Sequence, residues 1–146
     1  MKLRLVYRAT WTIAAICTDR GDCPLWEFLT EGVNDPEGGP GARSPLGKEQ
    51  VRLLARLRVI ARDGLPRNTA ISHQIEPEIW QLEEGRIRVL WFYDQGKMII
   101  VAHGFIKKTQ KTPEREKLIA RESLKRYRAA KLRGAVRLME KNDEKR

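Results

Sequence analysis

The stretch from residue 86 to residue 113 constrains the fold of this chain more than any other. It contains two runs of branched and aromatic residues, Ile87 to Tyr93 and Met98 to Ile106, separated by the polar segment Asp94–Lys97. This pattern is typical of a β-hairpin that closes in a tight turn. The second run continues directly into the lysine-rich segment 107–111. The sequence therefore predicts a hairpin that brings several ammonium groups to one end of a sheet.

The length of the turn determines which side chains of the predicted hairpin lie opposite each other. A two-residue turn would place Arg88 directly opposite His103. Lys107 would follow on the same face, because side chains alternate along a strand. A three-residue turn with Gly96 in the left-handed conformation would place Arg88 opposite Ala102 instead. The sequence leaves both registers open.

The rest of the chain predicts an α+β fold in one domain. The elements expected outside the hairpin are a strand within residues 3–16, a short helix over 25–29, a flexible loop over 34–47, a helix capped by Ser44 and ending near Asp63, a strand beginning after Pro77, and a long helix over 114–139. An N-terminal strand and two helices thus precede an antiparallel β-meander of about three strands, and a long C-terminal helix follows. We expect the helices to cover one face of the sheet and to leave the other face open.

The positive charge of the chain is concentrated in its last forty residues. The formal net charge is +10, and residues 107–146 hold 15 basic and 6 acidic side chains, which gives this segment a net charge of +9. Within the helix predicted there, Ala120, Leu124 and Tyr127 form an apolar stripe that can dock on the sheet. Such a charge asymmetry favours a polyanionic partner, most often nucleic acid. The alternative is a solvated basic helix, or one that contacts an acidic protein.

Neither a membrane segment nor a metal site is expected. No apolar run approaches the roughly 20 residues that span a bilayer. The N-terminal stretch, with Arg4 and Arg8, lacks the continuous apolar region of a signal peptide, so we expect a cytoplasmic protein. Cys17 and Cys23 are the only cysteines, and without nearby histidines they cannot form a four-ligand zinc site. We expect two reduced thiols, no metal and no cofactor.

The hairpin and the segment after it offer a group of side chains suited to RNA strand cleavage. In that reaction a 2′-hydroxyl attacks the adjacent phosphorus, so the site needs a proton acceptor, positive charge near the phosphorane and an acid for the leaving 5′-oxygen. Arginine can bind a phosphate through two hydrogen bonds, and lysines act as point charges. The candidate catalytic residues are Arg88, His103, Lys107, Lys108 and Lys111. In a simpler interpretation, the cations lie on an exposed sheet face without a functional role, and His103 is a structural histidine.

Further RNA-binding candidates flank this group. Two are polar residues in or directly after the lysine-rich segment, and three are basic residues of the C-terminal helix, which has no acidic residue between positions 125 and 137. These candidates are Gln110, Thr112, Lys125, Arg126 and Arg128. They predict a basic surface that extends from the hairpin along the helix.

The hairpin and its flanks closely resemble one protein family. The segment VLWFYDQGKMIIVAHGFIKKTQKTP, followed by EREKLIARESLKRY, is similar to the phage-derived Gp49-like, HigB-type branch of the RelE toxin superfamily. The ending HGFxKK(S/T)QKTP, before a helix that closes near Tyr127, is specific for this branch. The resemblance extends over about residues 76–127. It implies a RelE-like toxin domain over residues 1–127, followed by a basic helical extension over 128–146 whose end we expect to be disordered.

This resemblance implies the toxin of a type II toxin–antitoxin pair, a metal-independent endoribonuclease that cuts mRNA on the translating ribosome. The implied partners are ribosome-bound mRNA, ribosomal RNA and an inhibiting antitoxin of the HigA-like helix-turn-helix type. By position, Arg88 matches the middle-strand arginine that contacts the scissile phosphate. Lys107 and Lys108 match the basic residues after the last strand, and Lys111 lies where the superfamily carries a further catalytic or phosphate-contacting group. His103 matches a histidine common in this branch.

The sequence also departs from the family pattern. The family commonly carries a Leu-Arg pair on the strand before the hairpin, where this chain has Gln81-Leu82-Glu83. The loop 34–47 and the extension 128–146 are longer than expected for the branch. Weakened or altered cleavage is therefore one alternative. The others are a nucleic-acid-binding module without catalysis and a structural partner whose basic helix binds an acidic protein.

Overall fold

The computed structural model describes residues 1–36, 41–67 and 71–140. Its elements in chain order are β1 (Lys2–Arg8), β2 (Thr12–Ile16), α1 (Pro24–Thr30), α2 (Pro45–Asp63), β3 (Ser72–Glu76), β4 (Ile79–Glu84), β5 (Ile87–Asp94), β6 (Met98–Ile106), α3 (Glu114–Leu132) and β7 (Arg137–Met139). These three helices and seven strands confirm the predicted α+β class. Within the same residues, no helix combines the length and the apolar character needed to cross a bilayer.

The strands form one mixed sheet in the order β3-β4-β5-β6-β2-β1-β7. Strands β3 to β6 pair antiparallel as a meander, whereas β2 lies parallel to β6 and β7 lies parallel to β1. The predicted meander is therefore present, and β3 extends it by one strand at the edge. The predicted N-terminal strand is instead an antiparallel hairpin formed by β1 and β2.

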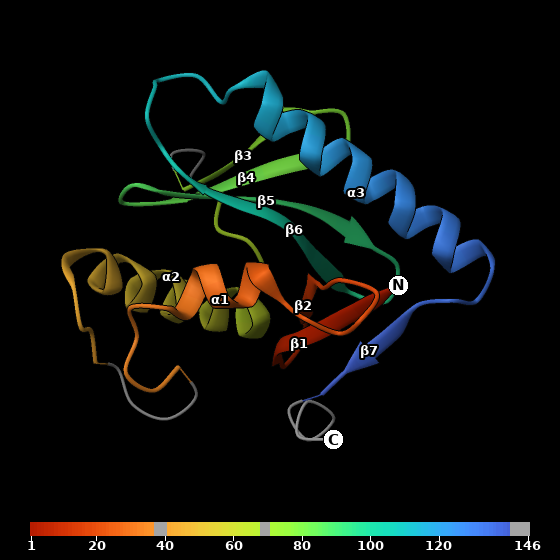
Figure 1. The fold of residues 1–146 in the computed structure, drawn as a ribbon, viewed down its shortest axis with the longest axis horizontal. Coiled ribbons are helices and arrows are strands. Elements are labelled where there is room, and N and C mark those ends of the chain that lie inside the picture. The colour runs from red at the N-terminus through yellow and green to blue at the C-terminus, as the bar shows by residue number, and fades with distance from the viewer. Residues whose placement is uncertain (37–40, 68–70, 141–146) are drawn as a thin grey trace.

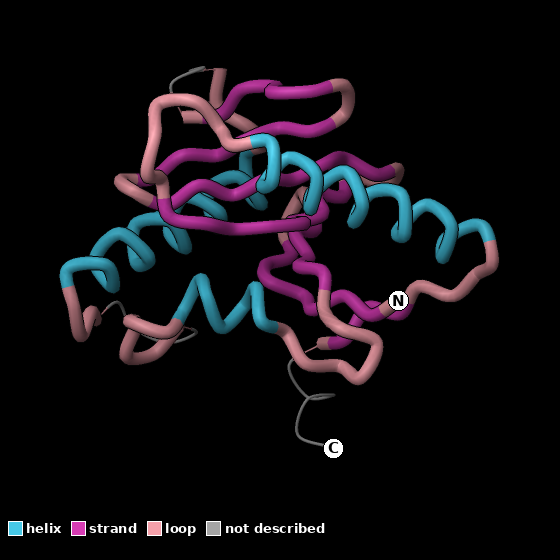
Figure 2. Tube along the Cα trace, turned by 45° about the horizontal axis from the view of Figure 1, so that its top comes forward, coloured by secondary structure: helices cyan, strands magenta, loops and turns pink. Residues whose placement is uncertain are grey.

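Helices cover both faces of this sheet, with α1 and α2 on one side and α3 across the other (Figure 1, Figure 2). The predicted apolar stripe of α3 packs on Leu90 and Phe92 of β5. The expectation of one open face is therefore wrong. Both faces of the sheet are covered because residues 87–92 of β5, which point to both faces, are all buried. Burial that continues without alternation along a strand is typical of a strand covered on both faces.

The register of the β5–β6 hairpin differs from both predicted registers. Its turn comprises Gln95–Lys97, with Gly96 at a φ of 80°. One further residue, Ala102, bulges out of the β6 ladder. As a result, Arg88 is opposite Phe105 rather than His103 or Ala102. A bulge adds one unpaired residue to one strand, and an apolar run carries no local signal for it.

The chain beyond α3 returns to the sheet. The helix ends at Leu132, not at Met139 as predicted, because Gly134 adopts a φ of 65° just after it. Residues 137–139 then pair with β1 as β7, and the amino group of Met1 donates a hydrogen bond to the carbonyl oxygen of Ala135. Disorder is predicted for residues 140–146, of which Glu140 is described and forms an ion pair with Arg8. Residues 141–146 lie outside the described residues, as do residues 37–40 of the predicted loop.

Cys17 and Cys23 form a disulfide, so the expectation of two reduced thiols is wrong. The segment between them folds back on itself. The Thr18 amide donates to the carbonyl oxygen of Asp22 over 2.8 Å, and the Gly21 amide donates to that of Thr18 over 2.9 Å. This turn brings the two Cα atoms to 4.4 Å of each other. Spacing alone did not indicate the turn.

A polar network joins α3 to the turn end of the hairpin. Asp94 accepts hydrogen bonds from the Tyr127 hydroxyl, from Lys131 Nζ at 2.6 Å and from the Gln95 amide at 2.7 Å. Burial by itself would raise the pKa of Asp94, but these hydrogen bonds outweigh it and lower the pKa below its usual range. Burial, and then the bond to Asp94, raises the pKa of Tyr127, which keeps its proton.

This network is expected to contribute stability that depends on pH. A carboxyl group whose pKa is lower in the folded than in the unfolded state stabilises the fold above its unfolded pKa, about 4. That contribution is lost as the pH falls through the lowered folded pKa. Tyr127→Phe should reduce the free energy of unfolding at pH 7 by about 2 kcal/mol, since the lost hydrogen bond is to a charged group.

Urea unfolding at pH 7 and pH 2 measures this effect, with Asp94→Asn as the matched variant. Both variants should differ from the parent protein at pH 7 and approach it at pH 2. A deficit of Asp94→Asn that is equally large at both pH values would show that the carboxylate charge does not act in this way.

Candidate functional site

A cavity of about 380 Å³ lies where β6 passes into the lysine-rich segment and α3 begins. It is lined by residues from β4, β5, β6, the segment 107–113 and the first turn of α3. The predicted site residues that it brings together are Arg88, His103, Lys107, Lys108, Gln110, Lys111 and Thr112. The bulged register therefore does not separate Arg88 from His103, and both belong to one site.

Arg88 is a buried cation in a fixed position. It is 7% exposed, and its Nε lies 3.0 Å from the Glu83 carboxylate on β4. Its Nη1 donates to the carbonyl oxygens of Gly85 at 2.8 Å and Ile87 at 3.0 Å. Charge-assisted hydrogen bonds of this kind restrict the rotamers of the side chain. The guanidinium is therefore held in place at the wall of the cavity.

Glu83 is a functional candidate that the sequence analysis missed. It lies directly opposite Arg88 in the β4–β5 register, and its second carboxylate oxygen lies 3.4 Å from Nδ1 of His73 on β3. His73, Glu83 and Arg88 thus form a row across three neighbouring strands. The sequence contained a signal for this ion pair. Glu83 and Arg88 carry opposite charges on either side of a short connection between two strands, and such residues often face each other across the strands.

His103 is oriented by α3 and by its own strand. Its Nε2 lies 3.3 Å from the Glu116 carboxylate, and its ring stacks on Phe105 with centroids 5.8 Å apart. A carboxylate can only accept, so a hydrogen bond here requires the proton on Nε2. Glu116 is itself buried. The sequence analysis did not identify it as a site residue, since an acid in a first helical turn is explained by the helix dipole alone.

Hydrogen bonds hold the lysine-rich segment at both ends. The amide of Lys107 donates to the carbonyl oxygen of Arg86 at 2.7 Å, which continues the β5–β6 ladder by one step. At the other end, the Thr112 hydroxyl donates to Oε1 of Gln81 on β4 over 2.6 Å. Lys108 and Lys111 between these anchors are exposed. The segment therefore presents its ammonium groups from a defined position at the cavity.

The remaining RNA-binding candidates lie elsewhere. Lys125, Arg126 and Arg128 are exposed on the later turns of α3 and do not line the cavity. Arg128 forms an ion pair with Glu78 at 2.7 Å, and this contact raises the pKa of Arg128. These residues form a basic surface beside the site rather than part of it.

The side chains that line this cavity can bind and polarise a phosphate group. Its described lining carries five Arg or Lys side chains and one carboxylate, Glu116. One cation, Arg88, is buried and preoriented, whereas the lysines are more exposed and can reach different oxygens of one phosphate. The imidazole of His103 lines the same cavity, and its Nε2 is within hydrogen-bond distance of the Glu116 carboxylate. Electrostatic stabilisation of a charged transition state requires this kind of fixed arrangement.

The fold and the cavity define an α+β protein of RelE-like architecture. The sequence profile of the phage-derived Gp49-like proteins matches residues 47–125, more than half of the chain, and the chain belongs to this family. The family is a RelE/HigB-like family of toxins from toxin–antitoxin systems, so the predicted resemblance is confirmed. The matched segment includes the cavity. No curated protein matches the chain.

Proposed function

We propose that this chain is the toxin of a type II toxin–antitoxin pair and acts as an endoribonuclease on mRNA at the translating ribosome. The observation that carries the proposal is the cavity at the hairpin end, where a buried arginine, a histidine and three lysines line one space. The family supports a toxin, and the chemistry of this cavity supports cleavage of RNA.

The proposed reaction is an attack of the 2′-hydroxyl on the adjacent phosphorus. Arg88 binds the scissile phosphate and, with Lys107, Lys108 and Lys111, stabilises the charge that develops on the phosphorane. His103, held by Glu116, exchanges a proton with the 2′-hydroxyl or with the leaving 5′-oxygen. The positive charge comes from side chains, so the proposed mechanism needs no metal. Glu83 neutralises part of the charge of Arg88, which is consistent with slower cleavage than in a site without it.

The proposed partners follow from the same surfaces. The basic face of α3, with Lys125, Arg126 and Arg128, adds attraction to ribosomal RNA. A cognate antitoxin of the HigA-like helix-turn-helix type would hold the toxin inactive. We propose a cytoplasmic protein in which residues 1–127 form the toxin domain and residues 128–146 a basic extension.

Mapping of mRNA 5′ ends in a translating extract tests the proposed function. Addition of the protein is expected to create new ends within coding sequence, and fewer of them when translation is stopped first. Intact mRNA together with salt-sensitive RNA binding would instead identify a binding module without catalysis. Co-purification with a small acidic protein, and no RNA binding, would identify a structural partner.

A further inference from the structure

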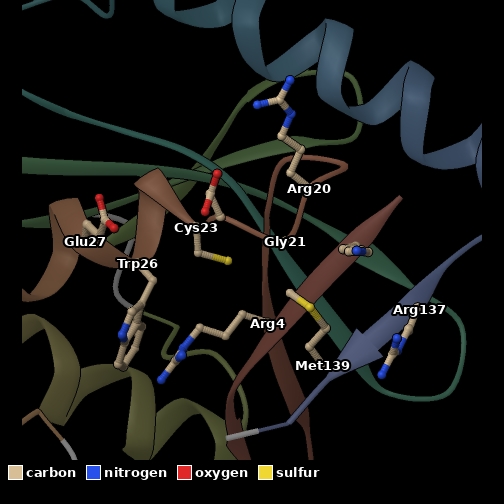
Figure 3. Close-up of a pocket in the computed structure, with 10 residues that line it drawn as sticks. Arg4, Arg20, Gly21, Cys23, Trp26, Glu27, Arg137 and Met139 are labelled. Carbon is tan, nitrogen blue, oxygen red and sulfur yellow. The ribbon is translucent and has the colours of Figure 1, made fainter. Parts of the chain in front are cut away.

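A second cavity of about 560 Å³ lies far along the chain from the proposed catalytic residues (Figure 3). It is formed by β1, the loop after β2, the start of α1 and β7. All of its lining residues fall within 2–27 and 137–139. The family profile matches residues 47–125, so this cavity belongs to parts of the chain outside the matched segment. Nothing in the proposed cleavage reaction uses it.

The charged side chains that line this cavity are mostly cationic. Lys2, Arg4, Arg20 and Arg137 line it together with two carboxylates, Asp22 and Glu27. The cations come from β1, from the loop and from β7, so they surround the space instead of lying along one helix face. Figure 3 shows Arg20 and Arg137 on different sides of the cavity and Arg4 extended toward Trp26. A concave site lined by more cations than anions concentrates positive potential inside it.

The residues that line this second cavity are held in fixed positions. Arg4 is 5% exposed, and its guanidinium carbon lies 4.1 Å from the centroid of the Trp26 ring. The parallel register of β1 and β7 places Arg137 beside Lys2 and Met139 beside Arg4. The disulfide and the turn described above fix the loop that carries Arg20. Strand pairing, a cation–π contact and a covalent link therefore hold the lining in place.

From this combination we infer that the cavity binds one nucleotide unit of a single RNA strand. Cations bind the phosphate, and the carboxylates of Asp22 and Glu27 can accept hydrogen bonds from amino groups of a base. The volume lies within the range of about 300–1,000 Å³ that is usual for small-ligand sites. An acidic peptide fits less well, because its side-chain carboxylates can bind the cations but have no hydrogen to donate to Asp22 and Glu27. The inference shares RNA with the proposed function but not the cleavage step.

Equilibrium binding of an octanucleotide tests this inference. The full chain is titrated into a fluorescein-labelled, single-stranded 2′-O-methyl RNA, and fluorescence anisotropy is recorded over a range of salt concentrations. This probe has no free 2′-hydroxyl, so the result does not depend on catalysis. Arg20→Ala with Arg137→Ala is compared with Arg62→Ala with Arg67→Ala, which removes the same charge from the exposed end of α2 and the segment after it.

The Arg20/Arg137 pair should weaken binding at least about 5-fold and lower the slope of log K against log salt by about 0.7, since one nucleotide unit carries one phosphate and each neutralised phosphate of a single strand contributes about 0.7. The control pair should change affinity less than 2-fold. If thermal melting shows that the first pair is misfolded, Arg20→Ala alone is used, with about half the change in slope expected. Equal losses in both pairs would overturn the inference.

A second ligand separates RNA from an acidic protein. Poly-L-glutamate is used to displace the labelled RNA from the parent protein and from both variant pairs. If RNA binding is unaffected by the Arg20/Arg137 pair while poly-L-glutamate binding is lost, the cavity is a site for acidic protein and the inference is wrong. Intact mRNA in the translating extract would reject the proposed endonuclease but leave this binding result unchanged.

Discussion

Replacing Arg88 by glutamine is expected to lower the rate of RNA cleavage about 10²- to 10³-fold, the usual cost of removing one fixed donor to a charged transition state. Arg88 is the buried cation of the cavity, and three polar contacts define its orientation. Glutamine keeps two donors but loses the positive charge and the planar fork. Single-turnover cleavage of an mRNA fragment on ribosomes measures the effect.

The same substitution is expected to affect stability, so a second variant is needed. Without Arg88, the carboxylate of Glu83 loses its arginine partner and keeps, among the described residues, the contact with Nδ1 of His73. Leaving one partner of a buried ion pair uncompensated costs about 3–5 kcal/mol, and since the Glu83 side chain is 26% exposed we expect a smaller loss of about 2 kcal/mol. Urea unfolding at pH 7 measures this loss.

Glu83→Gln combined with Arg88→Gln separates the two effects. The double variant removes the uncompensated charge, so its free energy of unfolding should return to within about 1 kcal/mol of the parent value. Its cleavage rate should remain as low as that of Arg88→Gln alone. Recovery of cleavage together with stability would mean that Arg88 is structural and does not act on the phosphate.

Local patterns predicted much of the fold and about half of the residues that line the cavity. The central hairpin, the lysine-rich segment and the apolar stripe of α3 were visible because each is a run of neighbouring residues with one periodicity. Seven of the predicted site residues therefore line one cavity, even though the register that first connected Arg88 with His103 was wrong. The bulge at Ala102 shifts the register but leaves both side chains at the same cavity.

The features that were missed depend on contacts between distant segments. Glu83 and Glu116 acquire their roles from a cross-strand neighbour and from the docking of α3, respectively. Strand β7 is three residues long, and it forms because β1 offers an edge for pairing. A single short strand has little intrinsic preference of its own, since strand propensity reflects the surroundings. The second cavity depends on this strand, so it could not be predicted without the tertiary structure.

Lys107→Ala with Lys108→Ala is expected to relieve the growth arrest caused by expression of the chain alone. Lys107 is half-buried at the end of β6, and Lys108 follows it on the exposed rim of the same cavity. Neither side chain has a role in the core, so the pair should keep the stability of the parent within about 0.5 kcal/mol, as is usual for surface substitutions. Relief of growth arrest would then indicate that phosphate binding is lost and not that the protein is misfolded.

Growth after induction, with protein levels measured in the same cultures, provides the comparison. Arg62→Ala with Arg67→Ala serves as the control, because it removes two exposed positive charges at and after the end of α2. The control should arrest growth like the parent, whereas the Lys107/Lys108 pair should allow growth at equal protein level. If both pairs relieve arrest equally, general attraction to RNA limits toxicity. If neither does, the lysines at the cavity do not take part in the toxic reaction.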